Sequence, residues 1–190
     1  MKNDRLYQGI SNAAWGYFFL YFDIKLGTLN ILPTFVGFLL FLSSIKHLRD
    51  EERELALLRP LGILLALWHG VQWVMALAGG DLAQGSPFLD VIVRLVNLYF
   101  HFQLLTNLAS IAAKYQPEGA GHDAKLIRYR TLQTVMLTGS VILTTLSPWL
   151  DQLGTYVSVG MMVVYLIAGI CLMVALFRLR RCFCEGDPAQ

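Results

Sequence analysis

The sequence contains few charged residues for its length. Charged residues make up 15% of its 190 residues and hydrophobic residues 56%, whereas soluble domains carry about 25% charged residues. The net charge is only +2, and the basic residues are scattered between apolar runs, which excludes the basic surface of a nucleic-acid-binding protein. The composition predicts one integral membrane domain over residues 1–190, with no separate soluble domain.

Cysteine is scarce as well. The three cysteines, Cys171, Cys182 and Cys184, all lie near the end of the chain. Cys182 and Cys184 supply two thiols where a structural zinc site needs four ligands, so we predict no metal site.

Sequence signatures of catalysis are absent. The chain has no Gly-x-Ser-x-Gly, His-Glu-x-x-His or Gly-x-x-x-x-Gly-Lys pattern. Glu51 and Glu52 are adjacent, like the paired glutamates of CAAX-type proteases. They lie in a charged loop, however, without histidine and asparagine partners at membrane depth. We predict no catalytic residue and favour a non-enzymatic protein.

Apolar runs predict an all-α bundle of six transmembrane helices. The predicted spans cover residues 6–22, 30–45, 60–78, 88–113, 130–146 and 154–177. No cleavage pattern follows the first run, so it is predicted to be a retained helix. Asn30 is the predicted N-cap of the second span, with Pro33 in its first turn, and Pro60 is predicted to open the third. The second span is short for a bilayer and crosses it only partly unless its basic end residues snorkel.

Basic residues indicate the orientation of the bundle. With the N-terminus in the cytoplasm, thirteen of the fifteen lysines and arginines fall in cytoplasmic segments, and only Lys25 and Arg94 do not. Because basic residues near span ends are retained in the cytoplasm, we predict that both termini lie there. The charged segment 46–59 is then a cytoplasmic helix extension or a short surface helix.

The span over residues 88–113 carries most of the intramembrane polar groups. Asp90, Arg94, Asn97 and His101 fall within a stripe about 60° wide on a helix. One interpretation is an inward face that hydrogen-bonds to other helices, with Arg94 paired to Asp90. The other is a ligand or ion site entered from the outer surface. Asp23, at the outer end of the first span, is a second carboxylate predicted to lie near Arg94.

The third span combines small and polar residues. Gly62, Ala66 and Gly70 form a small-xxx-small face that predicts close contact with another helix. His69 adjoins this face, and Gln72 lies on its flank. We predict that His69 faces the bundle interior.

His69 and His101 are predicted at similar depth on successive helices. Such a pair can ligate a b-type haem, but no supporting motif accompanies either histidine. We therefore predict no haem and no other cofactor. The aromatic cluster at residues 15–22, with Trp149 and Tyr156, is predicted to form the outer interfacial belt.

Residues 22–38, FDIKLGTLNILPTFVGF, resemble a segment of uncharacterised small membrane proteins of Gram-positive bacteria. In that pattern a carboxylate or amide often follows the proline, and Thr34 departs from it. The resemblance implies a bacterial plasma membrane and carries no activity. In length and helix number alone, the chain is similar to the substrate-binding subunits of energy-coupling-factor vitamin transporters.

Two classes of function fit these observations. One is a small-molecule-binding or transport subunit with an outward-facing polar pocket between the first, third and fourth spans. Its candidate ligand-binding residues are Asp23, His69, Gln72, Asp90, Arg94, Asn97 and His101. The other is a non-enzymatic membrane accessory or sensor protein whose polar residues hold the bundle together. The expected partners are the lipid bilayer and a small molecule or another membrane protein.

Overall fold

The chain folds into six α-helices and one short β-pair in the computed structural model, which describes residues 2–22, 25–26, 29–30, 33–78, 87–146 and 151–183. The helices are α1 (Lys2–Tyr21), α2 (Thr34–Leu48), α3 (Glu54–Leu77), α4 (Pro87–Tyr115), α5 (His122–Leu146) and α6 (Asp151–Arg181). Strand β1 (Lys25–Leu26) pairs antiparallel with β2 (Leu29–Asn30) ahead of α2. The predicted all-α class and the six helices are confirmed.

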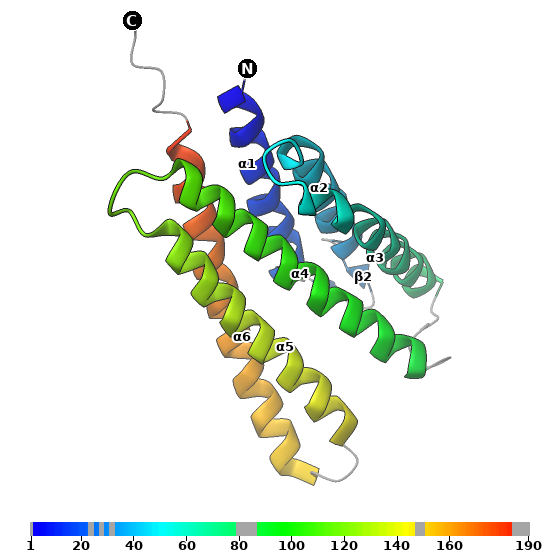
Figure 1. Cartoon of the computed structure of the whole chain (residues 1–190). Coiled ribbons are helices and arrows are strands. Elements are labelled where there is room, and N and C mark those ends of the chain that lie inside the picture. Colours follow the sequence, from blue (N-terminus) through cyan, green and yellow to red (C-terminus); the bar gives the residue numbers. More distant parts are fainter. Residues whose placement is uncertain are drawn as a thin grey trace, which may run out of the picture.

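The helices form a closed ring. Each packs against the next along the chain, and α6 returns to pack against α1 (Figure 1). The start of α1 and the end of α6 lie at the same end of this ring as the connections from α2 to α3 and from α4 to α5 (Figure 1). We call this the terminal end.

Packing is tightest toward the terminal end. There Leu6 and Ile10 of α1, Leu108 of α4 and Leu176 of α6 are all buried. Toward the opposite end, α3, α4, α5 and α6 expose apolar side chains such as Phe88, which is 74% exposed. Apolar surface of this extent is the surface that a lipid-facing helix presents.

Three helices in the described part of the chain are long and apolar enough to cross a membrane. They are Glu54–Leu77, Phe88–Tyr115 and Tyr156–Arg181. Thr34–Leu48 is apolar but shorter. Helices α1 and α5 begin with charged residues, which lowers their mean hydropathy.

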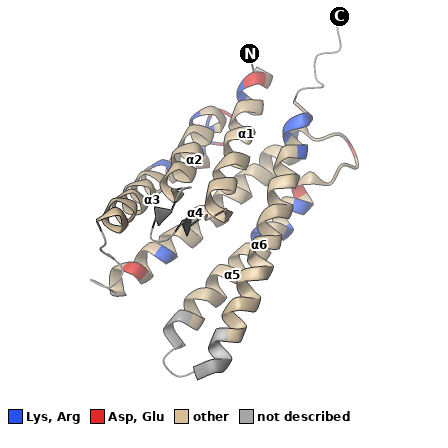
Figure 2. Ribbon diagram, turned by 180° about the vertical axis from the view of Figure 1, so that it is seen from behind, with Lys and Arg blue, Asp and Glu red and all other residues tan. Residues whose placement is uncertain are grey.

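Charged side chains gather at the terminal end (Figure 2). A further acidic and basic pair lies near the start of α4, where Asp90 and Arg94 form an ion pair.

The connection between α2 and α3 is tied to the ring by polar contacts. The Lys114 ammonium donates to Glu52 at 2.6 Å, the Tyr115 hydroxyl donates to Glu51 at 2.6 Å, and Arg5 pairs with Asp50 at 3.2 Å. Residues 49–53 of the charged segment are therefore a turn docked on α1 and α4, whereas residues 46–48 end α2 and residues 54–59 begin α3.

Helices α1 and α2 approach each other closely where two glycines meet. A Cβ atom on Gly37 would lie 2.9 Å from the carbonyl oxygen of Gly16, so a side chain there would strike backbone. Along the predicted face of α3, a Cβ added to Gly62 would lie 2.9 Å from the Leu42 side chain, whereas a Cβ added to Gly70 would meet nothing nearer than 4.0 Å. Only the first part of that predicted contact face is tightly packed.

The start of α2 differs from the prediction. Asn30 lies in β2 and caps no helix, and α2 begins at Thr34 after Pro33, with no side-chain cap. Strand pairing takes up Asn30 and separates it from the helix by three residues.

Pro60 does not open the third helix, because α3 already begins at Glu54. Leu55 and Leu58, which precede the proline, are buried in the core, and Glu54 accepts a hydrogen bond from Gln103 at 2.7 Å. These contacts stabilise the first turns and offset the roughly 3 kcal/mol that a proline inside a helix costs.

Candidate functional site

His101 lies on α4 in the interior of the ring. It is 1% exposed and is surrounded by four aromatic rings, with centroid distances of 5.4 to 5.9 Å. These rings belong to Tyr17, Phe38, Phe41 and Phe100. The Nδ1 atom lies 3.3 Å from the Tyr17 hydroxyl, and among the described residues the buried Nε2 atom has no hydrogen-bond partner.

His69 approaches the same cluster from α3. Its imidazole stacks on Phe38 with a centroid distance of 5.1 Å and an interplanar angle of 6°. Gln72, one turn further along α3, lies within hydrogen-bonding range of His69. Phe38 therefore contacts both histidines, which the sequence predicted at similar depth.

The predicted polar stripe of α4 divides into two parts. Asp90 and Arg94 pair with each other at 2.7 Å, and their side chains are 21% and 40% exposed. Asn97 and His101 turn inward, and the Asn97 Oδ1 atom is buried without a partner in the described part of the chain. Asp23 lies outside the described residues, so its predicted proximity to Arg94 stays a prediction.

Further along α4, Asn107 is also buried, whereas Gln103 is occupied by its bond to Glu54. Arg130 of α5 lies over the ring of Phe102 and donates to the Thr106 hydroxyl at 3.0 Å. Polar contacts thus continue along the side of α4 that meets α5.

Interior tyrosines belong to this polar interior, and the sequence analysis missed them. Tyr17 and Tyr21 are buried, although the aromatic cluster at 15–22 was predicted to lie at the membrane interface. Tyr21 contacts Tyr165 of α6 with a centroid distance of 4.8 Å. Tyr17 and Tyr21 stand one helical turn apart, on the face that also buries Ile10 and Ala14, and this spacing could have identified them.

Gln133 of α5 extends the interior polar groups toward a cavity. It is 3% exposed, and its amide oxygen and nitrogen are buried without a well-formed hydrogen bond. Its side chain lies beside Tyr165. A buried amide whose hydrogen bonds are incomplete costs on the order of 1–3 kcal/mol, so a further hydrogen-bonding group, such as a water molecule or a ligand group, is expected beside it.

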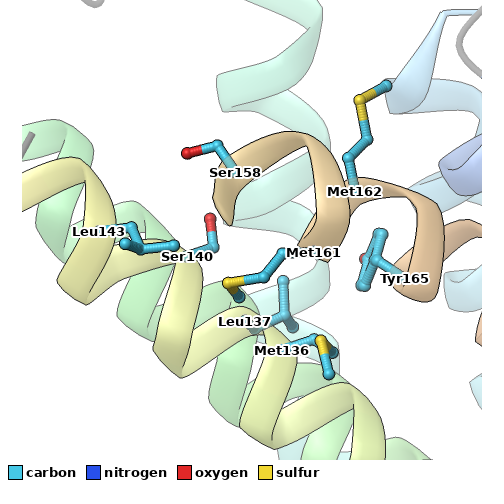
Figure 3. Close-up of a pocket in the computed structure, with 8 residues that line it drawn as sticks. All are labelled: Met136, Leu137, Ser140, Leu143, Ser158, Met161, Met162 and Tyr165. Atoms are coloured by element: carbon cyan, nitrogen blue, oxygen red, sulfur yellow. The ribbon is translucent and has the colours of Figure 1, made fainter. Parts of the chain in front are cut away.

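A cavity of about 430 Å³ lies between α5 and α6. Its walls are Met136, Leu137, Ser140 and Leu143 of α5 and Ser158, Met161, Met162 and Tyr165 of α6. Figure 3 shows Met161 reaching toward α5, while Met162 points away from it. Apolar and thioether groups form most of the wall, and Ser140 of α5 and Ser158 of α6 each contribute a hydroxyl group.

None of the seven predicted ligand-binding residues lines this cavity or the two cavities on α2 and α3 described below. Among these seven residues, His69 and His101 both pack against Phe38. Asp90 and Arg94 form a separate ion pair on α4.

In the described ranges, no three His, Cys, Asp or Glu side chains lie close enough together to hold a metal ion. Cys182 lies 3.9 Å from the Nε2 atom of His122, which makes a single contact between two such groups. Cys184 lies outside the described residues.

Comparisons with known proteins give no relative: no family model, no curated protein and no solved structure matches this chain. The fold and composition therefore define the class, an all-α protein with three long apolar candidate membrane spans.

Proposed function

We propose that this chain is a six-span membrane protein with both termini in the cytoplasm, and that it binds a small molecule between α5 and α6 as a binding or transport subunit. The resemblance of residues 22–38 supports a bacterial cytoplasmic membrane as its location. The whole chain serves as one transmembrane domain.

The arrangement of charge supports the orientation. The start of α1, the end of α6 and the connections that carry thirteen of the fifteen basic residues lie at one end of the ring (Figures 1 and 2). Basic residues on that scale keep a membrane end in the cytoplasm. Helix α2, with 15 residues, is about 22 Å long, shorter than a hydrocarbon core of about 30 Å. Helix α2 can therefore cross the hydrocarbon core only together with the residues that precede it.

Reporter fusions at Gln84 and Gly121 test this orientation. Gln84 follows α3 and Gly121 precedes α5, so the two reporters are expected to report opposite compartments. Both reporters in one compartment would exclude the six-span topology.

The cavity between α5 and α6 is the observation that carries the ligand proposal. Its volume of about 430 Å³ lies within the roughly 300–1,000 Å³ range of small-molecule sites. Gln133 lies beside Tyr165 of the cavity wall, and in the described part of the chain its buried amide atoms make no well-formed hydrogen bond. A mostly apolar molecule matches the apolar wall of this cavity, and one hydrogen-bonding group on it would match the polar side chains of Tyr165 and Gln133.

Native mass spectrometry of the purified protein, with an absorption spectrum, tests the ligand. Wild-type protein is expected to retain a small molecule, and the variant Ser140→Leu/Ser158→Leu, which fills the cavity from both helices, is expected to lose it. Thr131→Leu is the matched control, because Thr131 is exposed on α5 outside the cavity. Equal masses of bound material in all three proteins, or none in the wild type, would exclude the site.

A membrane accessory or sensor protein is the second candidate. It is favoured by the packing of His69 and His101 against Phe38, away from the cavity between α5 and α6. On this alternative the interior polar groups stabilise the bundle, and wild-type protein carries no small molecule into the mass spectrometer.

A further inference from the structure

A basic cavity lies between α2 and α3 at the terminal end. It has a volume of about 500 Å³, and its walls include Lys46 of α2, Arg49 directly after α2, and Arg59 of α3. Ser43 contributes a hydroxyl to the same wall. This hydroxyl accepts a hydrogen bond from the Asn12 amide at 3.0 Å, which leaves its own proton available to an anion.

An apolar groove continues from this cavity along the same two helices. The groove has a volume of about 620 Å³ and shares Leu42 and Ile63 with the basic cavity. Beyond them it runs past Leu39 and Leu67, both at least half exposed, to Gly70. The two cavities therefore adjoin, and we call the pair the channel, with a basic head and an apolar body.

The basic head is only partly neutralised by the protein. Arg49 lies 3.8 Å from Asp50, but that carboxylate lies closer to Arg5, at 3.2 Å. Lys46 and Arg59 form no ion pair with any carboxylate in the described ranges. The cavity thus keeps an excess of positive charge where the apolar groove ends.

We propose that this channel binds one acidic glycerophospholipid, with its phosphate at Lys46, Arg49 and Arg59 and an acyl chain along the groove. Charge complementarity selects the occupant. A phosphodiester is bound by guanidinium and ammonium donors, and a basic pocket between membrane helices at a cytoplasmic end is a site for anionic headgroups. The proposal requires α3 to lie in the membrane and is independent of the cavity between α5 and α6.

Lipid exchange in nanodiscs tests the site. The protein is placed in an equimolar mixture of phosphatidylglycerol and phosphatidylcholine, and the lipid that remains bound is identified by native mass spectrometry. Wild-type protein is expected to retain one phosphatidylglycerol in preference to phosphatidylcholine. Because each basic residue near an anionic lipid contributes about fivefold to its binding, Lys46→Gln/Arg59→Gln should lower this preference about 25-fold.

Two further variants separate the headgroup from the chain. Lys125→Gln/Arg128→Gln removes the same charge from exposed positions of α5 and should keep the wild-type preference. Gly70→Leu places a side chain in the groove, where a Cβ would meet nothing nearer than 4.0 Å, and it should reduce retention of both lipids.

Three outcomes would overturn the proposal. In the first, both double variants lose the preference equally. In the second, inorganic phosphate displaces the lipid while Gly70→Leu has no effect, which shows a site for a soluble anion. In the third, wild-type protein appears as a dimer that Gly70→Leu dissociates, which shows a second copy on the groove. A thermal melt of each variant confirms that it is folded.

Discussion

The imidazole of His101 on α4 contacts the hydroxyl of Tyr17 on α1, with 3.3 Å between Nδ1 and the oxygen. The two residues stand 84 positions apart in the chain. Their contact joins opposite sides of the ring inside a cluster of aromatic side chains. In such an environment each polar atom depends on the partner that the fold provides, since no water competes for it.

Tyr17→Phe is expected to lower the free energy of unfolding by about 1 kcal/mol. The substitution keeps the ring that packs on Phe41 but removes the hydrogen-bond partner of His101, and such bonds between membrane helices contribute about 0.6–1.7 kcal/mol. Unfolding in detergent by a chemical denaturant measures the change. Tyr99→Phe is the control, because Tyr99 is 56% exposed on α4; an equal loss in both variants would contradict the assignment.

The purified protein is expected to show no Soret absorption. Aromatic rings pack around His101, and Phe38 contacts both His101 and His69, so the space beside each imidazole is occupied by side chains. His69→Ala should lower stability without removing a chromophore. A Soret band that is lost in His69→Ala or in His101→Ala would show instead that the two histidines ligate a haem.

Gly37→Ala is expected to lower the free energy of unfolding by about 1–3 kcal/mol, the cost of inserting an atom into packed backbone. Its Cβ would lie 2.9 Å from the Gly16 carbonyl oxygen, and a helix backbone cannot move aside as a flexible side chain can. Gly160→Ala on α6 is the control, since nothing lies within 4 Å of a Cβ there. Thermal melts in detergent should separate the two variants clearly.

Hydropathy predicted the number and order of the helices because long apolar runs leave few alternatives. It placed the ends less well. The fifth span was predicted from residue 130, whereas α5 begins at His122. Hydropathy reports which residues leave water, but a helix can continue beyond the bilayer when its first turn is stabilised by other contacts. Gln116 supplies such contacts at the start of α5.

Pairings across the interior could not be read from the sequence. The pattern identified His69 and His101 as interior candidates, but their common neighbour Phe38 belongs to another helix. The close approach of Gly16 and Gly37 depends on how α1 and α2 pack. The sequence pattern of one helix shows which of its faces points into the bundle. It does not show which other helix packs against that face.

Asp90→Asn is expected to destabilise the protein by roughly 0.3–0.5 kcal/mol, because it leaves Arg94 without the carboxylate that it contacts at 2.7 Å. A double-mutant cycle with Arg94→Gln should show that most of this effect is coupling between the two residues. The same cycle with Asp23→Asn tests the other predicted partner. Stronger coupling of Arg94 to Asp23 than to Asp90 would make Asp23 the main partner of the arginine.

The start of α5 should show a pH-dependent contribution from Asp123. The Gln116 amide donates to the Asp123 carboxylate at 2.8 Å, and the backbone N–H of Ala124 adds a second bond; together they hold the pKa of Asp123 below its usual range. Because the folded-state pKa is the lower one, the stabilisation is present above the unfolded pKa of about 4. It is lost as the pH falls through the folded pKa.

Asp123→Asn should therefore melt at a lower temperature than the wild type at pH 7, and the difference should shrink once the pH falls below about 4. The neighbouring His122 has a pKa lowered chiefly by burial and raised in part by Asp123, so removing Asp123 also lowers the pKa of His122. Glu118→Gln removes a carboxylate from the same connection and controls for the loss of one charge. Melting temperatures of the three proteins from pH 3 to pH 8 measure the effect. A difference between wild type and Asp123→Asn that stays constant over this range would show that the carboxylate does not stabilise the start of α5.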